Sequence, residues 1–287
     1  MSARIVAMGD GLWDLFPDGP RFGGATANYA CHASRLGGDV SMVSGVGVDE
    51  RGEALLQVYR KHGVNTDCVQ ALQDYPTGVV QVELTENGLP TFTIGENAAW
   101  DHWAWNEEIE RTVRNADALY FGTLGQRGPL ARDGIRRALE IAKATQILRI
   151  LDINLRAPFF DDLLIRESIA LCTVLKISDE ELNRVCQACE IDASQSDESV
   201  LSDLRTKFEL DFVVMTRGAD GAMLIHPNGV VQQPGVPATV IDTVGAGDSF
   251  TASMTLGLLA GKGYPQILGD ACKVAAGVCS HAGAVPE

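Results

Sequence analysis

The chain has 287 residues with 23 basic and 38 acidic side chains, so its formal net charge is −15 at pH 7. Hydrophobic residues make up 46% of the composition and charged residues 21%, which excludes disordered and fibrous proteins and predicts a globular protein. The acidic excess argues against nucleic acids and anionic membranes as partners, because both are bound by clustered Lys and Arg.

The first eight residues form a short apolar run that is interrupted by Arg4 and followed by Asp10. This run predicts a buried first strand rather than a signal peptide. The chain contains no stretch of eighteen consecutive apolar residues, so we expect no transmembrane helix. Seven cysteines, spread from Cys31 to Cys279, predict buried free thiols in a reducing compartment. We therefore expect a cytoplasmic protein.

Two short runs, Val79–Leu84 and Thr91–Ile94, alternate apolar and polar residues and are separated by Glu86-Asn87-Gly88. This pattern predicts a β-hairpin of a half-exposed sheet. Such a sheet does not belong inside a parallel sheet covered on both faces, so we place it outside, as a small lid formed by roughly residues 11–17 and 77–100. A plain edge hairpin without a lid role is the alternative.

The rest of the chain alternates apolar strand-like runs with helical patterns. The expected strands are 118–121, 147–153, 174–177 and 212–215, and the expected helices are 131–144, 180–188, 199–207 and two that begin near residues 249 and 264. Pro227-Asn228-Gly229 predicts a hairpin turn. The rhythm predicts a mostly parallel sheet with helices on both faces. No linker marks a second domain, so we expect one domain over residues 1–287.

The segment Asp242-Thr243-Val244-Gly245-Ala246-Gly247-Asp248 comes directly before a helix-forming run. The glycines allow close approach of the backbone, and the free N–H groups of a first helical turn bind anions such as phosphate. A carboxylate at Asp248, beside such an anion, is suited to remove a proton from an attacking hydroxyl. The alternative is a capped helix start with an Asp in its first turn.

A second segment, Gly23-Gly24-Ala25-Thr26-Ala27-Asn28, also precedes a helix-forming run. An Asn amide provides a donor and an acceptor together and suits a polyol. Asp10 and Asp14 lie near the end of the first strand, and Asp14 with Asn28 forms a candidate pair for reading sugar hydroxyls. A loop with a capping Asp is the alternative.

Together the two segments resemble the N-terminal and C-terminal signatures of the ribokinase-like (PfkB) carbohydrate kinases. The segments 152–156, 176–181 and 216–221 match further family segments, so the resemblance covers essentially the whole chain. It implies a ribokinase-like three-layer α/β/α sandwich with a mostly parallel central sheet and a small β-sheet lid. It also implies transfer of the γ-phosphoryl group of ATP to a sugar hydroxyl, with Mg²⁺ as cofactor.

The resemblance implies a role for each matching residue. Asp248 is the catalytic base, and the backbone N–H groups of Gly245, Ala246 and Gly247 form an anion hole. The residues implied at the sugar are Asp10, Asp14, Gly24, Asn28, Ala98, Asn154 and Arg156. Those implied at the nucleotide are Thr216, Gly218, Gly221, Lys176 and His281. Glu181 acts on Mg²⁺ through water, with Ser178 where the family motif has Asn, and Asp242 falls where many members bind K⁺.

Three further side chains have two interpretations each. Trp100 and Trp103, with Ala98, follow the lid strands and are candidates for an apolar wall over the sugar; packing between lid and body is the alternative. Arg127, like Arg156, is a candidate for neutralising phosphate charge, and an exposed Arg in a loop is the alternative.

Within the family, Gly9–Pro17 resembles the opening of fructokinases, with Asp10 in place of Glu. Fructose is therefore the leading substrate, and other hexoses, ribose, 2-keto-3-deoxygluconate and nucleosides remain open. A catalytically silent sugar or nucleotide sensor on the same fold is a second hypothesis. A dinucleotide-dependent oxidoreductase is disfavoured, because no Gly-x-Gly-x-x-Gly follows the first strand. We also expect a homodimer formed through the lid, since an isolated small sheet leaves an apolar face exposed.

Overall fold

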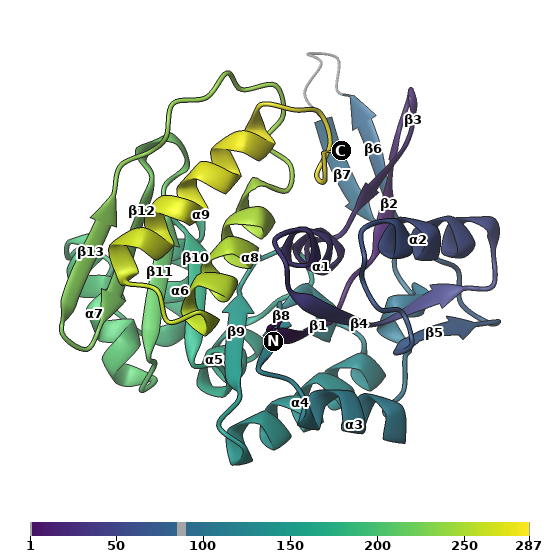
Figure 1. Cartoon of the computed structure of the whole chain (residues 1–287), viewed down its shortest axis with the longest axis horizontal. Helices are drawn as coiled ribbons and strands as arrows, with labels where there is room; N and C mark the ends of the chain where they lie inside the picture. Colours follow the sequence, from purple (N-terminus) through teal and green to yellow (C-terminus); the bar gives the residue numbers. More distant parts are fainter. Residues whose placement is uncertain (1, 85–89, 287) are drawn as a thin grey trace.

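The computed structural model describes residues 2–84 and 90–286, and its larger sheet has nine strands (Figure 1). Their order across the sheet is β13-β12-β11-β10-β9-β8-β1-β4-β5. The bounds are β1 Arg4–Met8, β4 Asp39–Gly47, β5 Val69–Leu72, β8 Ala118–Phe121, β9 Leu148–Asp152, β10 Val174–Ser178, β11 Phe212–Thr216, β12 Ala222–His226 and β13 Gly229–Gln233. Neighbours are parallel except where β12 pairs with β11 and β13, which confirms the predicted mostly parallel sheet.

Helices cover both faces of this sheet, as predicted. One face carries α1 Ala25–Arg35, α2 Glu50–Lys61, α8 Ala246–Leu259 and α9 Tyr264–Cys279; the other carries α3 Glu107–Arg114, α4 Pro129–Ala144, α5 Asp162–Leu171, α6 Asp179–Cys189 and α7 Asp197–Lys207. Strand β8 shows how one strand serves two cores. Leu119 and Phe121 belong to one hydrophobic cluster, while Ala118 and Tyr120 belong to the other, because successive side chains of a strand point to opposite faces.

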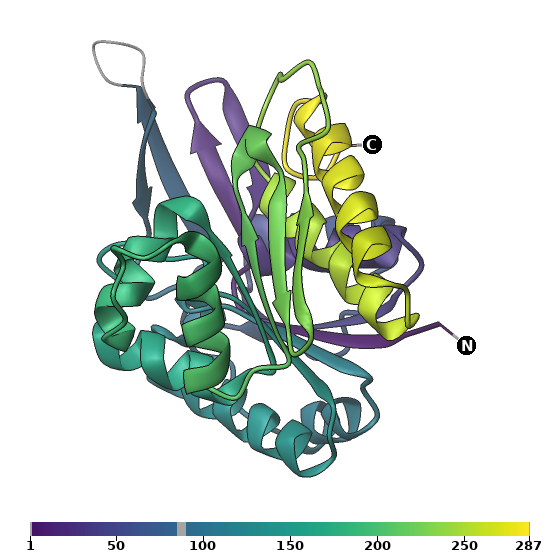
Figure 2. The ribbon, with the colours of Figure 1, turned by 90° about the vertical axis from the view of Figure 1, so that its left-hand side faces the viewer.

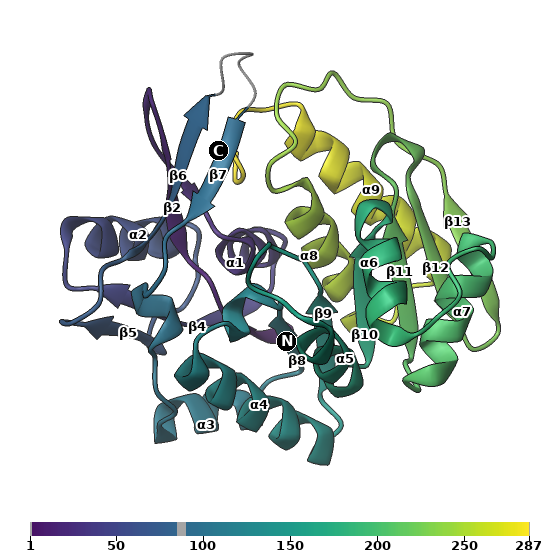
Figure 3. The ribbon, with the colours of Figure 1, turned by 180° about the vertical axis from the view of Figure 1, so that it is seen from behind.

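A second, four-stranded sheet projects from one end of this body (Figures 2 and 3). It has the order β3-β2-β6-β7, with β2 Leu12–Phe16, β3 Gly19–Gly23, β6 Gly78–Leu84 and β7 Pro90–Ile94. Leu12, Val80 and Val82 form a small apolar cluster of their own. The predicted lid segments contain β2, β6 and β7, whereas β3 was not predicted, because its Gly and Pro residues are typical of a turn.

Smaller sequence features also have their counterparts. His226 and Gly229 pair at the end of the β12–β13 hairpin, which confirms the turn predicted there, while the turn predicted at Glu86-Asn87-Gly88 lies outside the described residues. The seven cysteines are free thiols, and of these Cys279 alone is partly exposed.

Short 3₁₀ turns are η1 Ala99–Asp101, η2 Leu124–Gln126 and η3 Gly218–Asp220. No helix in the described ranges is long and apolar enough to cross a membrane.

Candidate active site

Most candidate residues meet at one edge of the larger sheet, where the parallel strands have their carboxyl ends. Asp10 follows β1, Asp152 ends β9, Ser178 ends β10 and Thr216 ends β11. The first turns of α1 and α8 reach the same edge, because the Asn28 side chain of α1 is hydrogen-bonded to Asp248 of α8. Ligands of open α/β sheets bind outside this edge, so the sequence motifs from both ends of the chain build one site.

The glycine loop at the start of α8 leaves backbone donors unused. Gly245 is the residue before the helix and has φ 79°, a conformation that favours glycine. The N–H groups of Gly245, Gly247 and Asp248 have no acceptor within the described part of the chain, whereas Ala246 N donates to Thr243 O at 3.3 Å. The predicted anion hole is thus available at Gly245 and Gly247, while the Ala246 donor takes part in a turn and Asp248 supplies a donor that the sequence had not indicated.

Asp248 is a half-buried carboxylate with one partner. Its Oδ2 accepts a hydrogen bond from Asn28 Nδ2 at 2.9 Å, and its Oδ1 accepts no hydrogen bond from another described residue. Burial, reinforced by the nearby carboxylate of Asp152, raises the pKa of Asp248 to about 7, although the Asn28 hydrogen bond works in the opposite direction. A carboxylate with this pKa exchanges a proton readily near neutral pH.

A buried network lies beneath the loop. Lys176 Nζ is 3.2 Å from Asp152 Oδ1, and both side chains are almost fully buried. Thr251 Oγ1 lies 2.9 Å from Asp152 Oδ2 and 3.0 Å from the Gly247 carbonyl oxygen. Burial lowers the pKa of Lys176, but the surrounding carboxylates, Asp152 first among them, raise it above its usual value. Lys176 therefore carries a positive charge close to the free N–H of Gly247.

The structure also shows that Gly247 lies close to Lys176. A Cβ atom at Gly247 would come within 3.3 Å of Lys176 Nζ, so the lysine lies directly against the loop. Sequence reasoning placed Lys176 at the nucleotide but missed Asp152 and Thr251. Their only sequence signal is a polar residue at a strand end and a hydroxyl one turn into α8.

Asp14 lies on strand β2 of the small sheet. Burial, followed by the charge of Asp10, raises the pKa of Asp14 to about 6, while Arg156 and Arg21 act to lower it. These electrostatic effects place Arg156, which is exposed, on the same side of the site as Asp14. The predicted sugar residues Asp14 and Arg156 are therefore close enough to interact electrostatically, while Asn28 contacts Asp248.

Asp10 and Gly24 have a structural explanation of their own. Asp10 Oδ2 accepts from Ala25 N at 2.8 Å, and Oδ1 accepts from Thr26 Oγ1 at 2.8 Å, so the carboxylate holds the start of α1. Asp10 is only 3% exposed. Gly24 has φ 99°, and a Cβ there would lie 2.9 Å from the Asp10 carbonyl oxygen. Asp10 thus plays the capping role of the alternative interpretation. By holding the start of α1, it also fixes the position of Asn28.

The residues that follow the small sheet, Ala98, Trp100 and Trp103, serve in packing, which is the second of their two interpretations. Trp100 and Ala98 are buried with Leu124 in a small cluster, and Trp103 lies in the body against Gly134 of α4, where a Cβ would come within 2.4 Å of its ring. Trp103 therefore faces α4 rather than the sugar.

Arg127 is also used structurally. It forms an ion pair with Asp101 at 2.8 Å, with both side chains almost fully buried, and its guanidinium stacks over the Trp100 ring at 4.0 Å. This arrangement leaves no charge free for a phosphate, so the expected phosphate-neutralising role of Arg127 is not supported. Asn154 has φ 41° and follows β9 at the edge that carries the site.

The residues predicted for the nucleotide lie beyond β10 and β11. Thr216 Oγ1 donates to Ile177 O at 3.4 Å. Gly218 begins the short turn η3 and Gly221 follows it, both with positive φ angles. A Cβ at Gly221 would lie 2.0 Å from the Gln233 carbonyl oxygen, so this loop packs tightly against the chain that follows β13. His281 is exposed beyond α9, with its Nδ1 2.9 Å from Gly277 O.

The segment after α9 closes over the glycine loop. Asp242 accepts from Val244 N at 3.0 Å and from Gly283 N at 2.9 Å. The Ala284 carbonyl accepts from His32 Nε2 at 2.8 Å, and a Cβ at Gly245 would come within 2.2 Å of the same oxygen. Asp242 thus ties two loops together, and its assignment to K⁺ stays a prediction.

Glu181 occupies the first turn of α6 with both carboxylate oxygens engaged. Oε1 accepts from Leu155 N at 2.7 Å, and Oε2 accepts from the backbone N and the hydroxyl of Ser178, each at 2.9 Å. This is a capping box, which explains why Ser serves in place of Asn. Among the residues that the structure describes, no group of three His, Cys, Asp or Glu side chains is arranged to hold a metal.

Three comparisons place this arrangement among known proteins. The model of the family described as pfkB family carbohydrate kinase matches residues 19–286. The chain is 29% identical over 261 residues to the aminoimidazole riboside kinase of Salmonella typhimurium, covering 88% of this chain and 79% of that protein. It is 28% identical over 278 residues to the fructokinase of Klebsiella pneumoniae, covering 93% and 88%.

The fold comparison agrees. The crystal structure of a fructokinase with bound ATP from Xylella fastidiosa matches with a TM-score of 0.86 over 98% of this chain and 94% of that chain, at 22% identity. The expected ribokinase-like fold is thereby confirmed.

Proposed function

The chain belongs to the pfkB family of carbohydrate kinases, and on that basis we propose that it transfers the γ-phosphoryl group of Mg-ATP to a sugar hydroxyl. Fructose is the first candidate. The observation that carries the proposal is the Asn28–Asp248 hydrogen bond of 2.9 Å. It joins a polyol-reading amide to a carboxylate with a pKa of about 7, at a helix start with unused N–H groups.

The residues of the site divide the chemistry between them. Asn28 and Asp14 hold the sugar so that one hydroxyl faces Asp248. The free Oδ1 of Asp248 accepts the hydroxyl proton as the oxygen attacks phosphorus. The N–H groups of Gly245 and Gly247 donate to the phosphoryl oxygens, where negative charge must be stabilised in the transition state. In phosphoryl transfer, positioning and charge stabilisation contribute most of the acceleration.

Lys176 supports this step from below. Its ammonium lies against Gly247 and is compensated by Asp152, so it adds positive potential under the anion hole without leaving an unpaired charge in the core. We assign it to stabilising the phosphate chain of the nucleotide, as predicted from the sequence.

The donor groups at this edge suit Mg²⁺ better than a metal ion that is held entirely by protein side chains. Mg²⁺ keeps several waters and is usually bound by one or two carboxylates together with substrate phosphates. Glu181 lies at this edge of the sheet, close enough to Lys176 to act on its pKa, and holds its carboxylate rigid through the capping box. When bound, the ion would neutralise phosphate charge; Glu181 would then act on it through water.

Substrate identity is tested by ADP release in a coupled assay. The panel is fructose, glucose, mannose, ribose, 2-keto-3-deoxygluconate, adenosine and aminoimidazole riboside, each with Mg-ATP, with and without K⁺. Aminoimidazole riboside is included because of the Salmonella typhimurium relative. Turnover on one sugar that disappears in Asp248→Asn supports the proposal. Tight sugar binding with no ADP release from any member would instead favour the sensor hypothesis.

We also propose a homodimer formed through the small sheet. Phe92 on β7 is 54% exposed, so an apolar side chain of the small sheet is available for a partner, whereas Val82, its neighbour across the β6–β7 ladder, is buried. Light scattering at micromolar concentration should give twice the chain mass of 30.7 kDa. A monomeric mass, or a dimer that persists unchanged in Phe92→Glu, would contradict this arrangement.

A further inference from the structure

A cavity of the described chain lies away from the site above, at the amino ends of the parallel strands. It has a volume of about 780 Å³. Its walls come from the starts of β8 to β11, the end of α4, and the connection from α8 to α9. The candidate active site occupies the carboxyl ends of the same strands, so the two sites are separated by the sheet and by the length of α8, whose 14 residues span about 21 Å.

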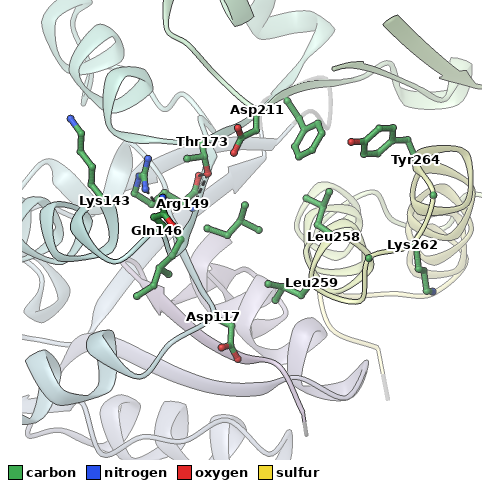
Figure 4. A pocket seen from close by; sticks show the side chains of 15 residues that line it. Asp117, Lys143, Gln146, Arg149, Thr173, Asp211, Leu258, Leu259, Lys262 and Tyr264 are labelled. Carbon is green, nitrogen blue, oxygen red and sulfur yellow. Dashed lines mark hydrogen bonds between the residues drawn. The ribbon is translucent and has the colours of Figure 1, made fainter. Parts of the chain in front are cut away.

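One side of this cavity is apolar. In Figure 4, Leu258, Leu259 and Tyr264 lie together on one side. The Tyr264 ring meets the Phe212 ring edge to face, with centroids 5.2 Å apart. These side chains are only partly buried. An apolar ligand that covered them would remove this surface from water, which is the main source of affinity in small-molecule pockets.

The opposite side carries positive charge. Lys143, Gln146 and Arg149 lie there in Figure 4. Arg149 donates through Nε to Leu171 O at 2.8 Å and through Nη1 to Ile147 O at 3.2 Å. Within the described ranges, neither Lys143 nor Arg149 has a carboxylate in ion-pair contact.

The other charges of the cavity are largely compensated. Asp117 is paired with Arg4 at 3.0 Å, and Lys262 is paired with Asp270 at 2.8 Å. Asp211 is an exposed carboxylate at the wall and acts on the pKa of Arg149. Glu140 of α4 also acts on the pKa of Arg149. Lys143 and Arg149 thus gather on one side of the cavity without an ion-pair partner among the described residues, in a chain whose net charge is −15.

We propose that this cavity is a second ligand site, which takes a small organic anion with an aromatic or aliphatic body and a carboxylate or sulfonate head. The body packs against Leu258, Leu259 and Tyr264, and the head lies toward Lys143 and Arg149. A nucleic acid or polyphosphate would need more cations than the two at this wall. A sugar would leave the apolar side uncovered.

The probe is 8-anilinonaphthalene-1-sulfonate, whose fluorescence rises in apolar surroundings. We expect saturable binding of one probe per chain that saturating Mg-ATP does not displace. Lys143 is exposed at the end of α4, and Lys143→Glu should weaken binding roughly fivefold to tenfold. The matched control is Lys273→Glu, the same change at an exposed lysine of α9 that does not line the cavity. It should leave the affinity unchanged.

A steric variant and a neutral probe complete the test. Gly263 lines the cavity, and a Cβ added there meets no atom within 4 Å, so Gly263→Trp should fold and obstruct the site, weakening binding more than tenfold. N-phenyl-1-naphthylamine, which lacks the sulfonate, should respond to Gly263→Trp but not to Lys143→Glu. Displacement of the sulfonate by Mg-ATP, equal affinity in all variants, or no saturable binding to the folded wild type would each overturn the proposal.

Discussion

The proposed base is tested most directly by Asp248→Asn. The amide is nearly the same size as the carboxylate and still offers an oxygen to Asn28 Nδ2, now 2.9 Å from Asp248 Oδ2, so the loop geometry should survive. The variant cannot accept the hydroxyl proton. We expect kcat to fall about 10²–10⁴-fold, the usual size of a general-base contribution, with a small change in KM for the sugar.

The pH dependence of wild-type kcat/KM measures how strongly turnover depends on ionised Asp248. With a pKa of about 7, about one tenth of the Asp248 carboxylates are ionised at pH 6 and about nine tenths at pH 8. The value of kcat/KM should therefore rise roughly tenfold over this range, and the residual activity of Asp248→Asn should lack that rise. Initial rates of ADP release between pH 5.5 and 8.5 measure both.

Stability gives an independent control with a defined sign. The folded-state pKa of Asp248, about 7, is above that of an unfolded Asp, so folding is favoured by the protonated form and loses stability as pH rises from about 4 through 7. Asp248→Asn should thus gain stability relative to wild type at pH 8 and lose that advantage at pH 4, as measured by urea unfolding. A variant that folds and turns over at the wild-type rate would refute the role of Asp248.

Three further changes test the surroundings of the base. Asn28→Ala removes the hydrogen bond that favours ionised Asp248, so the acid limb of kcat/KM should move to higher pH and the KM for sugar should rise. Lys176→Met leaves Asp152 unpaired in the core and should cost about 3–5 kcal/mol in urea unfolding, whereas adding Asp152→Leu should restore part of that loss. Gly245→Ala places a Cβ 2.2 Å from a backbone oxygen at a φ of 79°, so turnover should fall while the far-UV circular dichroism spectrum is retained.

Each of these changes has a control and a result that would contradict it. Gly37 also has a positive φ, of 99°, but a Cβ there meets nothing within 4 Å, so Gly37→Ala should keep the activity that Gly245→Ala loses. Equal activity in the two variants would show that the contact with the C-terminal segment is unimportant. An unchanged acid limb in Asn28→Ala would separate Asn28 from the base. A double variant no more stable than Lys176→Met would argue against the buried pair.

The sequence predicted the features that depend on local pattern. The β-strand and helix rhythm places the central sheet, and the spacing of glycines before a helix predicts the candidate anion site at Gly245 and Gly247. The hydrogen bond between Asn28 and Asp248 joins residues 220 positions apart. No local pattern contains such a pair; it follows only once the two helix starts meet at one sheet edge.

Other side chains have two uses that sequence cannot separate. A lone Arg near a loop suits a phosphate and a buried ion pair equally, and only the fold places Arg127 against Asp101 and Trp100. Trp103 follows the small sheet in sequence but packs under α4, because the glycine at position 134 leaves room for its ring. In both cases tertiary packing decides, through neighbours that are distant along the chain.

The small sheet holds its own apolar cluster of Leu12, Val80 and Val82, apart from the two clusters that hold the body. A cluster of this size stabilises its strands far less than the large cores stabilise β8 or β10. Backbone amides of β2 and β6 should therefore exchange hydrogen for deuterium through local opening, while those of the central strands await global unfolding. A ligand held between Asp14 and Asn28 would couple the two units, so its occupancy should be readable as slowed exchange in β2 alone.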